Sequence, residues 1–148
     1  MRRLPAILGC VVGLILTSAG PAQASPLPAG CTTTPPGIAK ATQNGVLGVV
    51  IAATPITCTA ASGYKFVSVT IGAQIMSVSA TGSVSYRNVP YRDSGVTRLP
   101  TTFFVPWQAI QPGGTPAQGY RGRIWYLLAA PGGTIINVSH FTGNVWGP

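Results

Sequence analysis

Apolar and polar residues alternate along most of the chain after residue 37. From Lys65 to Ile71 the alternation places Val67, Val69 and Ile71 on one face of an extended strand. No window of a dozen residues keeps the i, i+3, i+4 apolar spacing of an amphipathic helix. The pattern therefore predicts short β-strands, which we expect at residues 46–51, 65–71, 74–79, 83–87, 101–105, 123–130 and 134–139.

Glycine and proline clusters separate these segments. Thr81-Gly82 is suited to a hairpin turn, and Pro131-Gly132-Gly133 turns the chain toward its last strand. Six to eight short strands within about 110 residues are typical of an antiparallel β-sandwich. The sequence shows neither a repeat of fixed period nor a second domain, so we predict one β-sandwich domain at residues 38–148.

The first 24 residues have the pattern of a secretory signal peptide. Two arginines follow Met1, residues 4–16 are mostly apolar, and Ala22-Gln23-Ala24 offers small residues to a signal peptidase. The apolar run is shorter than the roughly 20 residues that a membrane span requires. Cys10 suggests a lipoprotein anchor as an alternative, but only six residues separate it from Arg3. We predict a signal peptide at residues 1–24 and an exported chain without a transmembrane segment.

Residues 25–37 are rich in proline and threonine, which predicts an extended leader. Cys31 and Cys58 are the two cysteines that remain after the signal peptide, an even pair in an oxidising compartment. Their spacing lacks the C-x-x-C pattern of a redox-active pair. We therefore predict a structural disulfide between Cys31 and Cys58.

Composition excludes several kinds of chemistry. Asp93 is the one acidic residue, so the chain cannot supply the paired carboxylates of a glycosidase or an aspartic protease, or those of a calcium site. One histidine and three cysteines leave no ordinary zinc site. We predict that the protein is not an enzyme and that it has no metal and no cofactor.

Asp93-Ser94-Gly95 is similar to a serine-protease motif, for which His140 would be the base. An aspartate adjacent to the serine is poorly placed to orient the histidine, however. The three residues are also typical of a turn between strands, which is the interpretation we prefer. For His140 we expect a surface imidazole, or one bonded to backbone at a strand end, rather than a metal ligand or pH switch.

Beyond residue 24, seven basic residues and one acidic residue give a net charge of +6. Several arginines lie among aromatic residues, a composition that binds phosphates and carboxylates: Arg87, Arg92, Arg98, Arg121 and Arg123 among Tyr86, Tyr91, Tyr120, Trp125 and Tyr126. On a strand, Arg121, Arg123 and Trp125 share one face, and Ile124, Tyr126 and Leu128 form the opposite, core face. The first set is our candidate interaction face. The alternative is that the charges only keep the protein soluble.

The last third of the chain carries a series of short motifs in a distinctive order. They are Trp107-Gln108-Ala109, the strand Gly122-Arg123-Ile124-Trp125-Tyr126, Gly133-Thr134-Ile135-Ile136 and the terminal Trp146-Gly147-Pro148. This series resembles the mycobacterial secreted immunogenic antigen family, the small MPT/MPB-type proteins, over about residues 103–148. The resemblance implies a secreted actinobacterial protein with an immunoglobulin-like sandwich and no established enzymatic activity. This chain departs from the family in its cysteine pair and its basic surface.

These observations predict a secreted, non-enzymatic β-sandwich that serves as an interaction or immunogenic module, extracellular or associated with the cell envelope. Its expected partner is a protein or an anionic envelope polymer. Nucleic acid would respond to the same charge, but an exported protein seldom meets it. Two alternatives are an inhibitor of hydrolases, which would present residues 111–119, and a cationic envelope-binding or antimicrobial protein.

Overall fold

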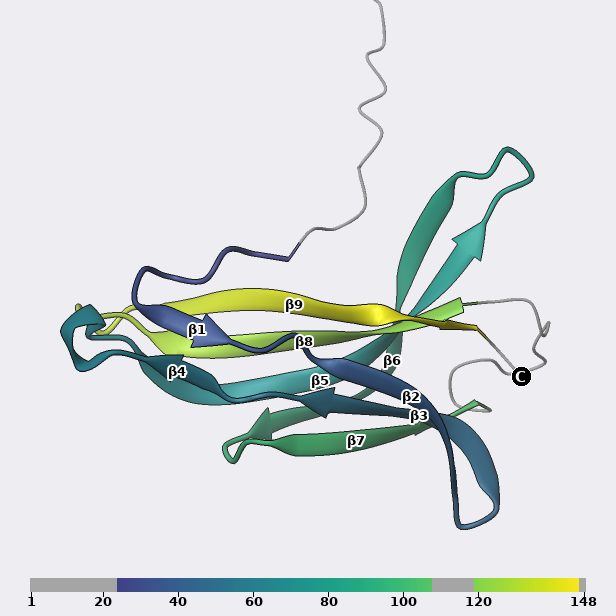
Figure 1. Cartoon of the computed structure of the whole chain (residues 1–148), viewed down its shortest axis with the longest axis horizontal. Coiled ribbons are helices and arrows are strands. Elements are labelled where there is room, and N and C mark those ends of the chain that lie inside the picture. Colours follow the sequence, from purple (N-terminus) through teal and green to yellow (C-terminus); the bar gives the residue numbers. More distant parts are fainter. Residues whose placement is uncertain (1–23, 108–118, 147–148) are drawn as a thin grey trace, which may run out of the picture.

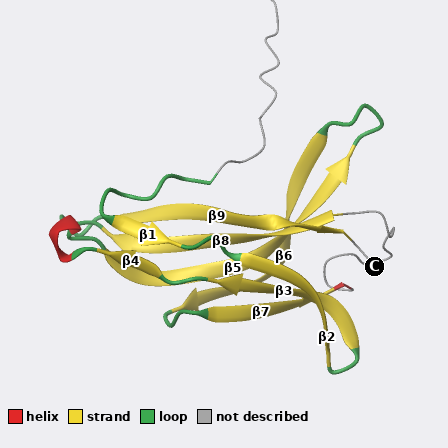
Figure 2. Ribbon diagram, viewed as in Figure 1, coloured by secondary structure: helices red, strands yellow, loops and turns green. Residues whose placement is uncertain are grey.

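The computed structural model describes residues 24–107 and 119–146, which form nine β-strands and a 3-10 turn (Figures 1 and 2). The elements are β1 (Cys31–Thr33), β2 (Gly37–Gln43), β3 (Val46–Ala53), β4 (Ile56–Cys58), η1 (Ala60–Ser62), β5 (Lys65–Val78), β6 (Val84–Val96), β7 (Thr101–Pro106), β8 (Gly119–Ala129) and β9 (Ile135–Trp146).

The strands pair in three antiparallel groups. One sheet has the order β2-β3-β7, the second has the order β6-β5-β8-β9, and β1 pairs with β4 in a short ribbon. Figure 1 shows the three-stranded sheet lying along the four-stranded sheet, while the tip of the β5–β6 hairpin projects away from both. The prediction of an antiparallel β-sandwich is confirmed.

The core lies between the facing sides of the two sheets. The fully buried side chains on these sides come from alternate positions of the strands: Val49, Ile51 and Val105 of the three-stranded sheet, and Val69, Ile71, Tyr120, Ile124, Tyr126 and Leu128 of the four-stranded sheet. The hydroxyl group of the buried Tyr126 has a hydrogen-bond partner, because Oη donates a hydrogen bond of 2.9 Å to the Thr54 carbonyl oxygen. Such burial supplies the main stabilisation of the fold.

Strand β5 differs from the prediction in one respect that affects its faces. The predicted segments 65–71 and 74–79 join into one strand, and a shift in the pairing with β8 falls between Phe66 and Ser68. Phe66 consequently packs against the core, while Val67 is 41% exposed. The prediction that Val67 shares the buried face of Val69 and Ile71 is wrong, because a β-bulge interrupts the period of two.

The predicted turn at Asp93-Ser94-Gly95 is also wrong. These residues lie within β6, where the pairing with β5 shifts between Val96 and Asp93, and Gly95 has a φ of 75°. Residues that favour a turn thus form a β-bulge, in which glycine accepts the positive φ at low cost.

The leader at residues 25–37 is more ordered than an unpaired extended segment. It contains β1, and its last residue begins β2. The Ser25 amide donates a hydrogen bond of 2.8 Å to the Ser139 carbonyl oxygen, and Leu27 packs against the core. The leader is therefore part of the folded domain.

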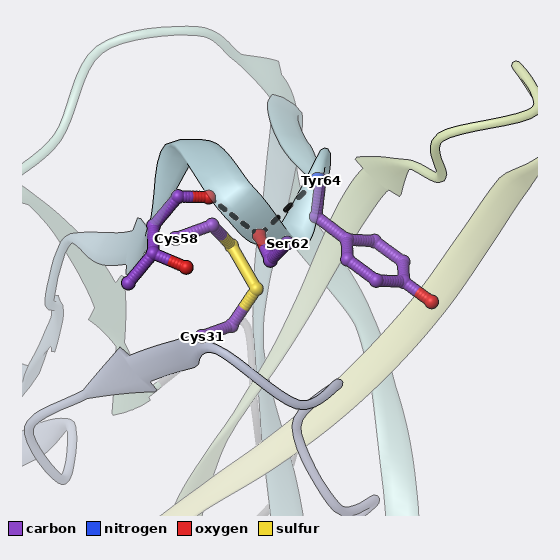
Figure 3. Close-up of a disulfide and its surroundings, with 5 residues drawn as sticks. Cys31, Cys58, Ser62 and Tyr64 are labelled. Atoms are coloured by element: carbon purple, nitrogen blue, oxygen red, sulfur yellow. Dashed lines mark hydrogen bonds between the residues drawn. A yellow bond between two sulfur atoms is a disulfide. The ribbon is translucent and has the colours of Figure 1, made fainter.

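Figure 3 shows the disulfide between Cys31 and Cys58, which confirms the predicted pairing. The two residues lie directly opposite each other in the β1–β4 ribbon, with their Cα atoms 4.0 Å apart. Next to it, Ser62 Oγ donates to the Thr59 carbonyl oxygen (2.7 Å) and accepts from the Tyr64 amide (3.3 Å). The disulfide joins the N-terminal ribbon to the chain that leads into β5.

Replacing both cysteines with serine should lower the free energy of unfolding by about 3.5 kcal/mol, because the unfolded chain loses the constraint on a loop of this length. The cysteines are 27 positions apart in the sequence. Urea unfolding of the oxidised wild type and the double variant measures the difference. Reduction of the wild type should give the same loss, and a loss below about 1 kcal/mol would contradict a stabilising role.

Gly122→Ala should destabilise the sandwich by about 1 to 3 kcal/mol, because the added methyl group enters a filled space between the sheets. Its Cβ would lie 2.6 Å from Ile51 Cγ2 and 2.8 Å from Thr142 Cγ2. Gly143→Ala is the matched control, since a Cβ there meets nothing within 4 Å. The midpoints of thermal unfolding compare the two variants, and equal midpoints would refute the proposed crowding at Gly122.

Candidate functional site

The candidate site lies on the side of the four-stranded sheet that is turned away from the three-stranded sheet, which we call the outer face. Arg121, Arg123 and Trp125 of β8 lie on it, at positions that alternate with the buried core residues Ile124 and Tyr126. The alternation along β8 therefore predicts correctly which side chains share a face. Whether this face binds a partner stays a prediction.

Arg121 is held in a largely buried position by neighbours from three other strands. Only 7% of the residue is exposed. Its guanidinium carbon Cζ lies 3.4 Å from the centroid of the Tyr86 ring and 4.1 Å from that of Phe141. Its Nε donates a hydrogen bond of 2.7 Å to Gln74 Oε1. The guanidinium is thus fixed by two aromatic rings and an amide, and none of these groups carries a compensating charge.

Arg123 lies beside it with weaker polar contacts. Its Cζ is 4.6 Å from the Trp125 ring centroid and 5.5 Å from that of Phe141. Nη1 and Nη2 lie 3.5 Å from Asn88 Oδ1 and from Ser139 Oγ, respectively, which is long for a hydrogen bond. Asn88 Oδ1 also accepts a hydrogen bond of 2.8 Å from Gln74 Nε2. A stronger acceptor could therefore replace these contacts at little cost.

Burial is the main influence on the pKa values of Arg121 and Arg123. Burial lowers the pKa of the Arg121 guanidinium. The charge of Arg123 also lowers this pKa, whereas Tyr86 raises it. Burial also lowers the pKa of Arg123. Both remain cations at neutral pH, because an arginine starts from a very high value. Within residues 24–107 and 119–146, neither guanidinium is paired with a carboxylate, and the buried atoms Arg121 Nη2 and Arg123 Nε have no hydrogen-bond partner.

Two pockets open on the outer face, one on each side of the arginine pair along the strands. The smaller, of about 220 Å³, is lined by Thr70, Arg92, Trp125, Leu127 and Asn137. The larger, of about 540 Å³, lies at the base of the projecting β5–β6 hairpin and is lined by Met76, Val78, Val84, Tyr86, Asn144 and Trp146. We call the larger one the hairpin groove. The outer face is therefore hollowed on both sides of a buried cation, Arg121, and a half-buried one, Arg123.

Gln74, Asn88 and Phe141 also belong to this cluster, although no sequence motif pointed to them. They lie on β5, β6 and β9, far from β8 in the sequence. Gln74 offers the one local signal, because it is a polar residue between apolar neighbours and is only 3% exposed. Contacts of Asn88 and Phe141 with the arginines depend on strand order, which the local pattern does not reveal.

The residues of the C-terminal motif series, on which the resemblance to the antigen family rests, lie in different surroundings. Trp107 is buried, with its ring centroid 4.3 Å from that of Tyr120, and Gly122 and Ile124 lie in the core. Trp146 is 53% exposed and lines the hairpin groove. Four of the sequence-based assignments lie mostly or wholly outside the described residues: Gln108 and Ala109, Pro148, the signal peptide, and the candidate inhibitory loop at 111–119.

Comparison of the chain with protein-family models, with curated proteins and with solved structures gave no significant match. The described residues contain no group of three histidine, cysteine or acidic side chains that could hold a metal ion. In the same part of the chain, no helix has the length and apolarity to cross a membrane.

The structure separates the residues of the serine-protease alternative. Asp93 pairs with Ile71, Ile71 with Ile124, and Ile124 with His140, so Asp93 and His140 occupy opposite edges of the four-stranded sheet. Three strand spacings amount to about 14 Å. Asp93, Ser94 and His140 therefore cannot form a hydrogen-bonded catalytic group.

His140 lies within β9 rather than at a strand end, so its predicted position is wrong: the strand continues to Trp146. Its ring packs edge-on against Tyr126, with the centroids 5.9 Å apart, and its buried Nε2 has no hydrogen-bond partner. Burial lowers the pKa of this imidazole. The side chain is therefore a half-buried neutral imidazole rather than a surface group.

Acidification should destabilise the protein through His140. Because the pKa of His140 is lowered in the folded state, the unfolded chain binds the proton first, and stability falls as the pH drops from about 6.5 toward the folded-state pKa. The loss should stay below about 1 kcal/mol because the ring is only partly shielded from water. Urea unfolding at about pH 7.5 and pH 5.5 should show a smaller loss in His140→Gln. Equal losses in both proteins would contradict this account.

Proposed function

We propose that this chain is a secreted, non-enzymatic β-sandwich that binds an anionic partner through the outer face. The observation that carries the proposal is the pair Arg121 and Arg123: one buried nitrogen of each, Nη2 of Arg121 and Nε of Arg123, lacks a hydrogen-bond partner, and neither charge is paired within the described residues. Removing a guanidinium from water costs free energy that a bound anion would restore. A face that only improved solubility would leave its cations exposed.

The site is also preorganised for such a partner. Tyr86 and Phe141 contact the guanidinium of Arg121, and Gln74 fixes its Nε. Guanidinium groups held in this way bind carboxylates and phosphates with defined geometry, at a smaller loss of side-chain entropy than flexible cations. Hydrogen bonds to charged groups contribute about 1.5 to 3 kcal/mol each.

The proposal also includes secretion of the protein and its relationship to a known family, and both of these parts rest on the sequence. The pattern of residues 1–24 and the cysteine pair support secretion, with the protein extracellular or associated with the cell envelope. The order of the C-terminal motifs supports a relationship to the mycobacterial secreted immunogenic antigens and to their immunoglobulin-like fold. The partner would be an envelope polymer or an acidic surface of a host protein.

The test compares two variants that remove the same charge from different places. The mature chain, residues 25–148, is bound to immobilised polyglutamate and to an anionic envelope fraction at low and high salt. Arg123→Gln removes a cation of the site, and Arg98→Gln removes an exposed cation outside it. We expect Arg123→Gln to weaken binding about tenfold or more and Arg98→Gln less than twofold, because only the first removes a direct contact.

Two results would contradict the proposal. One is an equal loss in both variants, which would mean that binding depends only on net charge. The other is the absence of retention at low salt. A saturable partner that remains bound at high salt in the wild type, and is lost in Arg123→Gln, would support a specific interaction face. Circular dichroism of both variants verifies that they are folded.

A further inference from the structure

The hairpin groove is apolar at one end and borders the arginine pair at the other. Along the β5–β6 pairing, Val78 faces Val84, Met76 faces Tyr86, and Gln74 faces Asn88. The first of these pairs is exposed and apolar, whereas Gln74 of the last contacts Arg121. The outer face therefore changes from apolar to cationic within three successive pairs on the same side of the sheet.

The apolar end is unusually accessible for side chains of its kind. Val78 is 51% exposed, Val84 47% and Trp146 53%. Gly119 gives Met76 and Trp146 room to lie over β8, because a Cβ at this position would collide with Met76 Cε and would lie 3.4 Å from the Trp146 ring. The chain thus presents a concave apolar surface instead of filling it with its own side chains.

The cationic end is organised around Tyr86. Its ring lies on the guanidinium of Arg121, with Cζ 3.4 Å from the ring centroid, and the same residue lines the groove. Asn144 Nδ2 lies 3.4 Å from Tyr86 Oη, so their contact is long and exchangeable. The Tyr86 hydroxyl and the Asn144 amide can both donate hydrogen bonds at the groove wall, with a positive charge directly behind them.

We propose that the hairpin groove binds a single-chain amphiphile with a carboxylate head group, the chemical class of fatty acids. The acyl chain lies over Met76, Val78, Val84 and Trp146, and the carboxylate accepts hydrogen bonds from Tyr86 Oη and Asn144 Nδ2 beside the charge of Arg121. The groove volume of about 540 Å³ falls in the usual range for small-molecule sites. The inference rests on the proposed function, because the same arginine supplies the charge.

Complementarity in charge selects this occupant over others. A neutral apolar chain would gain nothing from Arg121, and a cationic amphiphile would be repelled by it. A second copy of the chain offers only Asp93 as an acidic side chain, and Asp93 lies in β6 beyond the groove. An anionic head group joined to an apolar chain is the chemistry that uses both ends of the groove.

The experiment titrates the mature chain with decanoate, decanol and decyltrimethylammonium below their micelle-forming concentrations, followed by calorimetry. We expect saturable binding of decanoate that is at least tenfold tighter than binding of the other two. Equal affinity for all three, tighter binding of the cation, or no binding of decanoate would each overturn the proposal.

Variants at both ends of the groove test the assigned contacts. Val84→Ser should weaken decanoate binding about tenfold, while Leu47→Ser, at a side chain that is 40% exposed on the other sheet, should leave it unchanged. Tyr86→Phe should weaken binding of decanoate but not of decanol, because it removes a donor and retains the ring. Val78→Ser provides a second variant of the apolar end, and an unchanged decanoate affinity in both serine variants would exclude the groove.

Polyglutamate distinguishes failure of this inference from failure of the proposed function. Val84→Ser should retain its affinity for the polymer, because it leaves both arginines in place. If decanoate does not bind but Arg123→Gln still loses polymer binding, only the amphiphile site is wrong. If both experiments fail, the anion-binding function is wrong as well.

Discussion

The strict alternation of side chains along β8 is the constraint on which the rest of the structure depends. Ile124, Tyr126 and Leu128 fill the space between the sheets, and the positions between them place Arg121 and Arg123 on the outer face. A shift of one residue in the pairing of β8 would direct both guanidinium groups into the apolar core, at a prohibitive cost in free energy. The same packing that stabilises the sandwich therefore fixes the position of the candidate site.

On the outer face, Arg121 is almost entirely shielded from water and Arg123 is partly shielded, and neither has an acidic partner among the residues that the structure describes. Aromatic rings and the Gln74 amide compensate Arg121 in part, but its Nη2 and the Nε of Arg123 remain without acceptors. A composition with a single carboxylate side chain leaves little scope for internal ion pairs, which is why we propose that the compensating charge comes from another molecule. The scarcity of carboxylates in the sequence therefore supports the proposed function together with the two arginines.

Local sequence patterns predicted the parts of the structure that depend on local alternation. They predicted β3, β5, β7, β8 and the first parts of β6 and β9, together with the hairpin at Gly82, the disulfide and the two faces of β8, and the structure confirms these. They did not predict β1, β2 or β4. They missed the bulges that expose Val67 and place Gly95 inside β6, because a bulge is defined by pairing with another strand. The contacts of Tyr86, Gln74 and Phe141 with Arg121 were missed for the same reason, since they depend on the order β6-β5-β8-β9.

The most direct test of the central claim is to observe the guanidinium groups while an anion is added. Nuclear magnetic resonance can follow the Nε–H signals of the mature chain's arginines during a titration with short-chain polyglutamate. Our account predicts that the signals of Arg121 and Arg123 shift together and saturate, while that of the exposed Arg98 hardly moves. Shifts that never saturate, or that are equal at Arg98, would show that the anion senses only the net charge and that the outer face is not a binding site.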